Sequence, residues 1–443
     1  MAPMPLPEKG IPAEELLARL RSFKAADAKW HGGRMFGLIY MAGQDVEDVI
    51  GRAYATYMFE NGLSPLAFPS LLKMETEFIS MVTALFGGDG QTVGAMTSGG
   101  TESILMAVKA ARDWARAERP TPGTPEMVAP VTIHPAWNKA AHYLGLKIKL
   151  TPVRGDCRAD LEAMKAAITE NTIILGATAV TYPHGVVDPI GEIGRLAEEH
   201  NLWLHVDACL GGYMLAFLRR LGRDIPPFDF SVPGVRSMSV DIHKYGFTPK
   251  GASTVLYRNA RLRQFQFFVY TDWPGGVYAT PSVSGARPGG SIAAAWAVLH
   301  YLGLEGFLEM ARKARTATEK LMDGINRIEG LEVISDPEAT VFAFTSDRLN
   351  IFELGARLKQ KGWHIDSQHL PPSLHMTVSP IHEQIADEFL RDLKELAAEV
   401  SHVEPDQLSQ EAALYGLMGT LPDRQAAKEF ALQYLSELYS YKG

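Results

Sequence analysis

The chain has 443 residues, 46% hydrophobic and 21% charged, which is ordinary globular usage and excludes a long disordered or fibrous chain. At roughly 100–200 residues per domain, two or three domains are expected. Lys and Arg number 43 against 51 Asp and Glu, and this net charge of −8 argues against a protein that binds nucleic acid through its overall charge.

The two cysteines, Cys157 and Cys209, are too few for a disulfide framework or a Cys-rich zinc site, so no metal site is predicted. The first ten residues carry prolines and charges where a signal peptide needs an unbroken apolar run. The most apolar helical run, 292–304, is too short to cross a bilayer of roughly 30 Å. We therefore expect a soluble, cytoplasmic protein without a transmembrane segment.

Residues 1–60 show no strand pattern and are expected to form an N-terminal segment that packs on a partner subunit. The proline-rich stretch 119–130 is expected to be a surface loop. Nearly continuous apolar runs at 172–180, 203–206, 238–240 and 254–257 predict buried strands, with a helix at 190–200 between the first two. Strands buried on both faces and separated by helices predict an α/β domain with a mainly parallel sheet, over residues 61–305.

The pattern changes after Leu304. Helical segments around 307–328 and 381–400 flank short strands near 331–334 and 340–345. This order predicts a smaller α+β domain over residues 306–443.

The first candidate for chemistry is the turn TSGGTES at 97–103, which leads into an amphipathic helix. Such a turn presents unpaired N–H groups of Gly100 and Thr101 at the positive end of the helix dipole, an arrangement that suits a phosphate group. An ordinary capped turn has the same residues, so this motif alone does not decide between the two interpretations.

The second candidate is Asp207, which ends the apolar strand HVD at 205–207. Ligands of open α/β sheets collect at the carboxyl ends of strands, and a buried carboxylate needs a cation such as a protonated pyridine nitrogen. A helix-capping aspartate is an equally good interpretation in isolation. His205 lies two residues earlier on the same strand face and would stand behind Asp207.

The third candidate is Lys244, in the run DIHKYG at 241–246 that directly follows another short strand. Burial at a strand end is expected to lower the pKa of this lysine and make it a Schiff-base nucleophile, although a solvated loop lysine is the common case. The combination favours chemistry: a phosphate cradle, a strand-end aspartate and a strand-end lysine are, in this order, the parts that a pyridoxal phosphate enzyme needs.

Four runs carry a family resemblance: TSGGTES (97–103), HVDACLGGY (205–213), SVDIHKYGFTPKGASTVLYRN (239–259) and TDWPGGVYATPSVSGARPGG (271–290). Together they resemble the group II pyridoxal-phosphate-dependent decarboxylase family, and within it the soluble bacterial sphingosine-1-phosphate lyases. The resemblance extends from about Gly33 to the run YGLMGTLPDR at 415–424. It implies the fold of the fold-type I pyridoxal-phosphate enzymes and a homodimer.

The resemblance also implies roles for individual residues. Lys244 would bind pyridoxal 5'-phosphate through a Schiff base, and Asp207 would keep the pyridine nitrogen protonated. The cofactor phosphate would be bound by Gly100, Thr101 and His243, and His134 would stack on the pyridine ring.

Two further residues would act on the substrate. Lys250 would be a second active-site lysine, and Tyr40 would be a tyrosine contributed by the N-terminal segment of the other subunit; either could assist proton transfer. The family carries Asn-Pro-x-His-Pro where this chain reads Asn61-Gly62-Leu63-Ser64-Pro65, so Ser64 replaces a histidine near the substrate phosphate.

The resemblance implies a retro-aldol cleavage of a phosphorylated sphingoid base, or a similar amino alcohol, to a long-chain aldehyde and phosphoethanolamine. An amino-acid decarboxylase uses the same cofactor anchors and releases carbon dioxide instead. A non-enzymatic cofactor-binding protein is a weaker alternative, because mere binding would not require both Lys244 and Asp207.

Overall fold

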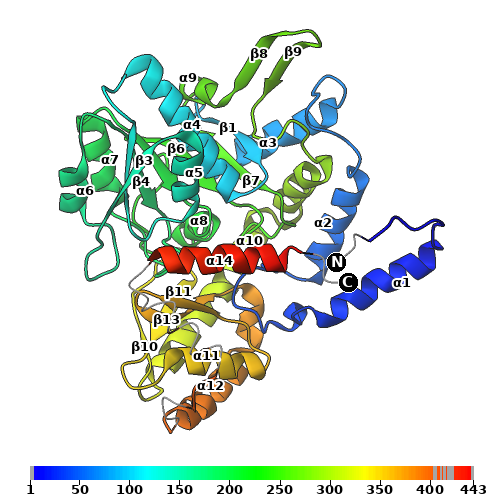
Figure 1. The fold of residues 1–443 in the computed structure, drawn as a ribbon, viewed down its shortest axis with the longest axis vertical. Helices are drawn as coiled ribbons and strands as arrows, with labels where there is room; N and C mark the ends of the chain where they lie inside the picture. Colours follow the sequence, from blue (N-terminus) through cyan, green and yellow to red (C-terminus); the bar gives the residue numbers. More distant parts are fainter. Residues whose placement is uncertain (1–3, 403–406, 410–411, 413–415, 417–423, 441–443) are drawn as a thin grey trace.

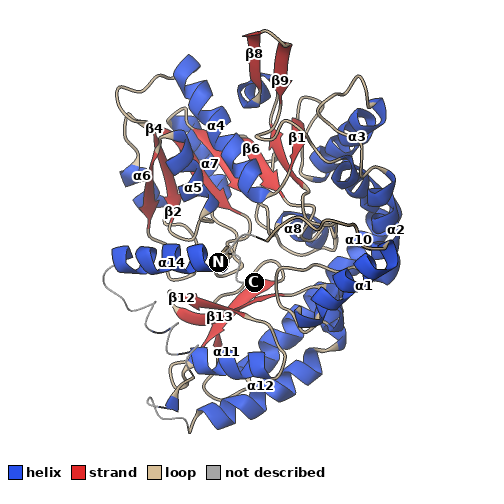
Figure 2. Ribbon diagram, turned by 45° about the vertical axis from the view of Figure 1, so that its right-hand side comes forward, coloured by secondary structure: helices blue, strands red, loops and turns tan. Residues whose placement is uncertain are grey.

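The computed structural model describes residues 4–402, 407–409, 412, 416 and 424–440. Its body consists of a larger α/β domain and a smaller domain below it, with a cavity between them (Figures 1 and 2). Apart from Gly416 and Arg424, the run 415–424 that contributed to the family resemblance lies outside the described residues.

The large domain is built on a seven-stranded sheet in the order β1-β7-β6-β5-β4-β2-β3. Strand β7 runs antiparallel to both of its neighbours, and the other adjacent pairs are parallel, so the predicted α/β class with a mainly parallel sheet is confirmed. The strands are β1 (Val93–Thr97), β2 (Glu126–Pro130), β3 (Lys147–Thr151), β4 (Thr172–Thr178), β5 (Trp203–Asp207), β6 (Val235–Val240) and β7 (Ser253–Tyr257).

Helices cover both faces of this sheet. One core contains side chains of α4 (Gly100–Glu118) and α5 (Ala136–Leu144), and a second contains side chains of α3, α6, α7, α8 and part of α10. These helices are α3 (Pro69–Leu85), α6 (Leu161–Ala167), α7 (Ile190–Glu199), α8 (Gly212–Arg220) and α10 (Gly289–Asn326), while the short α9 (Ala260–Arg263) and η3 (Gln264–Gln266) follow β7.

The stretch expected to be a surface loop is only partly one. Its last five residues form β2, a fully buried strand between β4 and β3. The expectation was wrong there because the apolar run Met127-Val128-Ala129 is buried in the sheet, and Pro130 stands only at the end of this run.

The small domain is confirmed as α+β. Its antiparallel sheet has the order β10-β11-β13-β12 and packs against helices that follow its strands in sequence. The elements are β10 (Glu332–Val333), β11 (Val341–Thr345), α11 (Ile351–Gln360), β12 (Asp366–His369), β13 (Pro372–Thr377), η4 (Pro380–Gln384) and α12 (Ala386–Val400). Helix α14 (Arg424–Leu438) follows them in the chain and is drawn between the two domains in Figure 1.

The apolar run 292–304 does not end where the sequence indicated. It continues through a kink at Gly303 into the 38-residue helix α10, which by length and composition alone could span a membrane. In this fold α10 packs against α2, α3 and α8 and supplies buried core side chains such as Ile292 and Phe307. The expected domain boundary at residue 305 falls inside this helix.

The N-terminal segment joins both domains. Its elements are α1 (Ala13–Phe23), η1 (Lys24–Ala26), η2 (Trp30–Gly32) and α2 (Gln44–Thr56), and α1 extends away from the body without a buried residue (Figure 1). Between η2 and α2, Phe36 lies in the small-domain core, with its N–H donating to the carbonyl of His364 at 2.9 Å. Helix α2 contributes Val46 and Ile50 to the large-domain core.

Candidate active site

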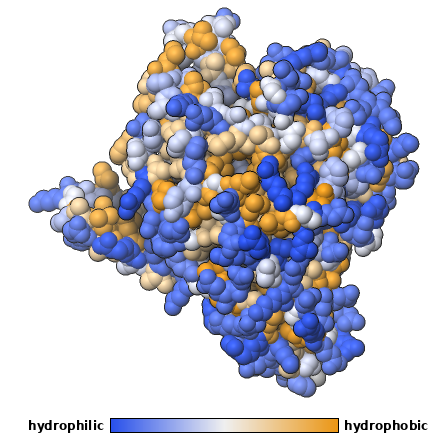
Figure 3. Space-filling model, turned by 180° about the vertical axis from the view of Figure 1, so that it is seen from behind, coloured by the Kyte–Doolittle hydropathy of each residue, from blue (hydrophilic) through white to orange (hydrophobic). Residues whose placement is uncertain are grey.

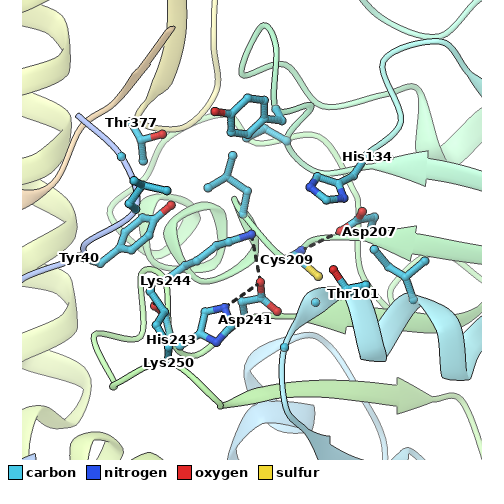
Figure 4. Close-up of a pocket in the computed structure, with 18 of the residues that line it drawn as sticks. Tyr40, Thr101, His134, Asp207, Cys209, Asp241, His243, Lys244, Lys250 and Thr377 are labelled. Carbon is cyan, nitrogen blue, oxygen red and sulfur yellow. Dashed lines mark hydrogen bonds and ion pairs between the residues drawn. The ribbon is translucent and has the colours of Figure 1, made fainter. Parts of the chain in front are cut away.

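A cavity of about 470 Å³ lies where the carboxyl ends of β4 and β5 face the small domain. Eight of the ten residues predicted for the site line it: Tyr40, Gly100, Thr101, His134, Asp207, His243, Lys244 and Lys250. Figure 4 shows most of them converging on one space from separate elements.

The glycine turn reaches the cavity through the first turn of α4, which begins at Gly100. A Cβ on Gly100 would come within 2.8 Å of Cys209 Sγ and 2.9 Å of an Asp241 carboxylate oxygen, so only glycine fits there. Glu102 fixes the turn, because its carboxylate accepts hydrogen bonds from Ser98 N–H and from the N–H of Val283. The helix N-terminus is thereby held open toward the cavity.

Asp207 is the last residue of β5 and is 4% exposed. One carboxylate oxygen accepts a hydrogen bond from the Cys209 N–H at 3.1 Å, which orients the group at the start of the following turn. A buried carboxylate in this position can stabilise a cationic ring nitrogen.

His134 lies in the loop between β2 and α5, on the opposite side of the cavity from Lys244 (Figure 4). Its Nδ1 accepts a hydrogen bond from the Ala136 N–H at 3.1 Å. This contact fixes the orientation of the imidazole ring at the edge of the cavity.

Lys244 follows β6 in a tight turn, in which the Phe247 N–H donates to the Lys244 carbonyl at 2.9 Å. Its Nζ lies 3.0 Å from an Asp241 carboxylate oxygen, and Asp241 is 2% exposed. Burial would lower the pKa of Lys244, but the Asp241 carboxylate outweighs this effect and raises the pKa. The expectation that burial lowers the pKa of Lys244 was therefore wrong, because it left out the charge three residues earlier.

Asp241 contacts two basic side chains, those of Lys244 and His243. The His243 Nε2 lies 3.3 Å from the same carboxylate oxygen, and the Ser253 hydroxyl donates to the other one. Burial would raise the pKa of Asp241, but the charges of Lys244 and His243 lower it well below the usual range. The sequence signal for this residue was present but unused: an aspartate directly after a buried strand, three positions before the lysine.

Lys250 and Tyr40 stand together at the rim. The Lys250 ammonium donates to the His243 carbonyl at 3.0 Å and lies 4.9 Å from the centre of the Tyr40 ring. Partial desolvation and the charge of Lys244 lower the pKa of Lys250 to about 8, although its side chain is exposed at the rim. Burial raises the pKa of Tyr40 to about 12.

Tyr40 reaches the cavity of its own chain, in contrast to what the resemblance implied. The reason is the anchoring of its segment: Phe36 stacks on His382 of the small domain with ring centres 4.3 Å apart, and Tyr40 packs edge-on against Tyr245. The segment therefore passes between the two domains and delivers Tyr40 from within the chain.

Two predicted residues do not line this cavity. His205 is fully buried beside it, with Nδ1 2.8 Å from the Ser237 hydroxyl and Nε2 3.1 Å from the Ser239 hydroxyl, and burial lowers its pKa to about 4. Ser64 is exposed in the loop before α3.

Other lining residues were missed by the sequence. They come from distant segments and include Leu38, Cys209, Tyr182, Asp366 and Thr377. Cys209 follows Asp207 in the turn after β5, whereas Asp366 and Thr377 come from the small domain, and only its packing against the large domain brings them to the cavity.

The residues fit pyridoxal phosphate. Two buried polar atoms of the cavity lining, His243 Nδ1 and Thr178 Oγ1, have no hydrogen-bond partner among the described residues. The lining also brings together an amine, a strand-end carboxylate, an imidazole and a helix N-terminus shaped by Gly100. These are the groups that bind an aldehyde, a pyridinium nitrogen, an aromatic ring and a phosphate.

Comparison with known proteins identifies the family of the chain. Residues 3–347 match the family described as pyridoxal-dependent decarboxylase conserved domain. A sphingosine-1-phosphate lyase of Oryza sativa subsp. japonica is 42% identical over 439 residues, which cover 97% of this chain and 81% of that protein. A probable L-aspartate decarboxylase of Pyrococcus abyssi is 32% identical over 390 residues, 88% of this chain and 98% of that protein.

A solved structure gives the same result for the fold. The sphingosine-1-phosphate lyase of Burkholderia pseudomallei superimposes with a TM-score of 0.91 at 36% identity, covering 99% of this chain and 98% of the other. The chain therefore belongs to the pyridoxal-dependent decarboxylase family, and within it to the sphingosine-1-phosphate lyases.

Proposed function

We propose that this protein is a pyridoxal-phosphate-dependent lyase that cleaves a phosphorylated sphingoid base to a long-chain aldehyde and phosphoethanolamine. The observation that carries the proposal is the convergence of Lys244, Asp207 and the Gly100 turn on one cavity in a chain that is 42% identical to a sphingosine-1-phosphate lyase.

In this proposal Lys244 Nζ binds the cofactor covalently, Asp207 holds the proton on its ring nitrogen, and His134 stacks on the ring. Gly100, Thr101 and His243 bind its phosphate, and His205 supports Asp207 from the same strand without lining the cavity. Pyridoxal phosphate, when bound, supplies the conjugated system that accepts the electron pair of the broken bond.

Lys250 and Tyr40 act on the substrate. With a pKa near 8, the Lys250 ammonium is a suitable acid at neutral pH and can deliver a proton to Cα after cleavage. Tyr40, whose phenol stays protonated because its pKa is about 12, can donate a hydrogen bond to the head group. Its position over Lys250 keeps both donors on one side of the cavity.

The competing function is that of an amino-acid decarboxylase, which the relative from Pyrococcus abyssi favours at lower identity. Product analysis separates the two. We expect the holoenzyme to release aldehyde from a phosphorylated sphingoid base and no carbon dioxide from a panel of amino acids. Carbon dioxide release without aldehyde would refute the lyase proposal.

The Lys244→Ala variant is the matching test of the site. Loss of the nucleophile should abolish the visible absorbance of bound cofactor that borohydride removes from the wild type, together with nearly all turnover. Wild-type turnover by this variant would refute the role of Lys244.

We also propose that the protein forms a homodimer and acts in the cytoplasm. Figure 3 shows apolar side chains gathered on the hairpin of β8 (Phe268–Trp273) and β9 (Gly276–Thr280) and across the face seen from behind. Helix α1 also has an apolar side without a buried residue, so a partner subunit would cover both surfaces. The exposed side chains are Leu16, Leu17, Leu20, Phe23, Phe268, Val269, Tyr270, Trp273 and Val277. Sedimentation of a fully active monomer would contradict this part.

A further inference from the structure

A tyrosine of the large domain and an aspartate of the small domain meet at the cavity. Tyr182 lies in the loop after β4, and Asp366 begins β12. The Tyr182 hydroxyl donates a hydrogen bond to an Asp366 carboxylate oxygen at 2.9 Å, and both residues line the cavity that contains Lys244.

The small domain fixes the position of this tyrosine. His375 of β13 stacks on the Tyr182 ring with ring centres 4.0 Å apart, and His375 is the register partner of Asp366 across the β12–β13 pair. Gln368 of β12 donates a hydrogen bond to the Pro183 carbonyl at 3.1 Å. One pair of strands therefore holds both the ring and the hydroxyl of Tyr182.

Both members of the pair are exposed. Tyr182 is 37% exposed, and Asp366 is exposed at the surface of the small domain. Burial raises the pKa of the Tyr182 phenol, and the Asp366 carboxylate raises it further. A phenol in this state gives up its proton only when it receives another one, so Tyr182 can pass a proton on without becoming an anion.

The other polar groups near the reaction are less suited to accept the first proton. Lys250 with a pKa near 8 is mostly cationic at neutral pH, and Lys244 is paired with Asp241. Tyr40 has its hydroxyl hydrogen-bonded to Thr377, a neutral partner. Tyr182 is the tyrosine of the cavity lining whose hydroxyl donates to a carboxylate.

We propose that Tyr182 and Asp366 form a proton relay that takes the β-hydroxyl proton of the substrate from the cavity to the surface. This inference rests on the lyase function proposed above. The substrate O–H proton passes to the Tyr182 oxygen while the Tyr182 proton passes to Asp366. The Cβ–O bond becomes the carbonyl of the leaving aldehyde, the Cα–Cβ bond breaks, and its electron pair stays with the amino fragment. Asp366 then releases the proton to solvent.

Steady-state kinetics of the holoenzyme on a phosphorylated sphingoid base test the relay. General acid–base groups contribute roughly 100-fold or more to a rate, so Asp366→Ala should lower kcat by about 100-fold and leave KM within about twofold. Asp366→Asn, which keeps the size of the side chain, should lose as much, and Asp366→Glu should retain part of the rate. Tyr182→Phe combined with Asp366→Ala should be no slower than the slower single variant, since both belong to one relay.

Chemical rescue separates a relay from a merely structural contact. Formate should restore part of kcat in Asp366→Ala, because the exposed position admits a small carboxylate, and should do nothing for Tyr182→Phe. Asp347→Ala, which removes an exposed aspartate of the small domain outside the cavity, is the control and should keep wild-type kinetics.

Each outcome decides the proposal. Wild-type kcat in Asp366→Ala or Asp366→Asn, multiplicative losses in the double variant, or an absence of formate rescue would overturn the relay while the lyase function stands. A wild-type holoenzyme that releases no aldehyde would overturn the proposed function itself, and the relay with it.

Discussion

Replacing Asp241 by asparagine should destabilise the cofactor-free protein by about 3–5 kcal/mol, the usual cost of removing one partner of a buried ion pair. Asp241 is 2% exposed and lies 3.0 Å from Lys244 Nζ. Opposite charges at that separation attract by about 5.5 kcal/mol at an effective dielectric constant of about 20. Asparagine keeps the shape but leaves the buried ammonium without its counter-charge, so the pKa of Lys244 should fall below the ordinary lysine value.

Urea unfolding followed by tryptophan fluorescence measures this loss in protein freed of cofactor, because a covalent bond to Lys244 would change its charge. The double variant Asp241→Asn with Lys244→Met should regain about half of the loss, since no unpaired charge remains buried. Glu15→Gln, which breaks the exposed pair with Arg19 on α1, is the control and should cost less than about 1 kcal/mol. The reasoning fails if Asp241→Asn is as stable as the wild type, or if the two substitutions are simply additive.

Three other outcomes are expected. Asp207→Asn should retain bound cofactor, seen by absorbance, while kcat falls, because a neutral amide does not hold the charge of a protonated ring nitrogen; an unchanged kcat would contradict this. Ser64→His should lower KM for a phosphorylated sphingoid base with little change in kcat, because charge-assisted donors bind phosphate more strongly. Ser64 does not line the cavity of its own chain, so the effect requires a second subunit. An unchanged preference for the phosphorylated over the unphosphorylated substrate would refute this prediction. Burial lowers the pKa of His382 to about 4, below the unfolded value of roughly 6.5, so its contribution to stability is complete above pH 6.5 and is lost as the pH falls toward 4. Between pH 7.5 and 5.5 this loss is about 1.4 kcal/mol, and His382→Gln should remove it from the pH dependence of the unfolding free energy; an identical pH dependence in both proteins would refute the assignment.

The proposed proton relay and the ion pair between Asp241 and Lys244 lie in different parts of the molecule. The Asp241 pair lies within the large domain, whereas Tyr182 meets Asp366 only across the interface with the small domain. Variants of the first pair should therefore change stability and cofactor binding together. Variants of the second should change turnover alone.

The sequence by itself predicted the α/β class and singled out Gly100, Asp207 and Lys244, which line one cavity, because both depend on local order along the chain. Each of these residues stands in a short-range pattern: Gly100 in a glycine turn, Asp207 at a strand end and Lys244 in the turn after a strand. Parallel strands then bring these ends to the same edge of the sheet. They meet in one cavity because of the sheet topology, which the alternation of strands and helices along the sequence already indicated.

Only the tertiary structure decided the pKa of Lys244, the path of Tyr40 and the place of Asp366. The pKa direction depends on a 3.0 Å approach to Asp241 that residue spacing does not measure. Tyr40 enters its own cavity because Phe36 is buried in the small-domain core. Asp366 meets Tyr182 through the packing of two domains, and no periodicity in either segment encodes a contact between residues so far apart in the chain.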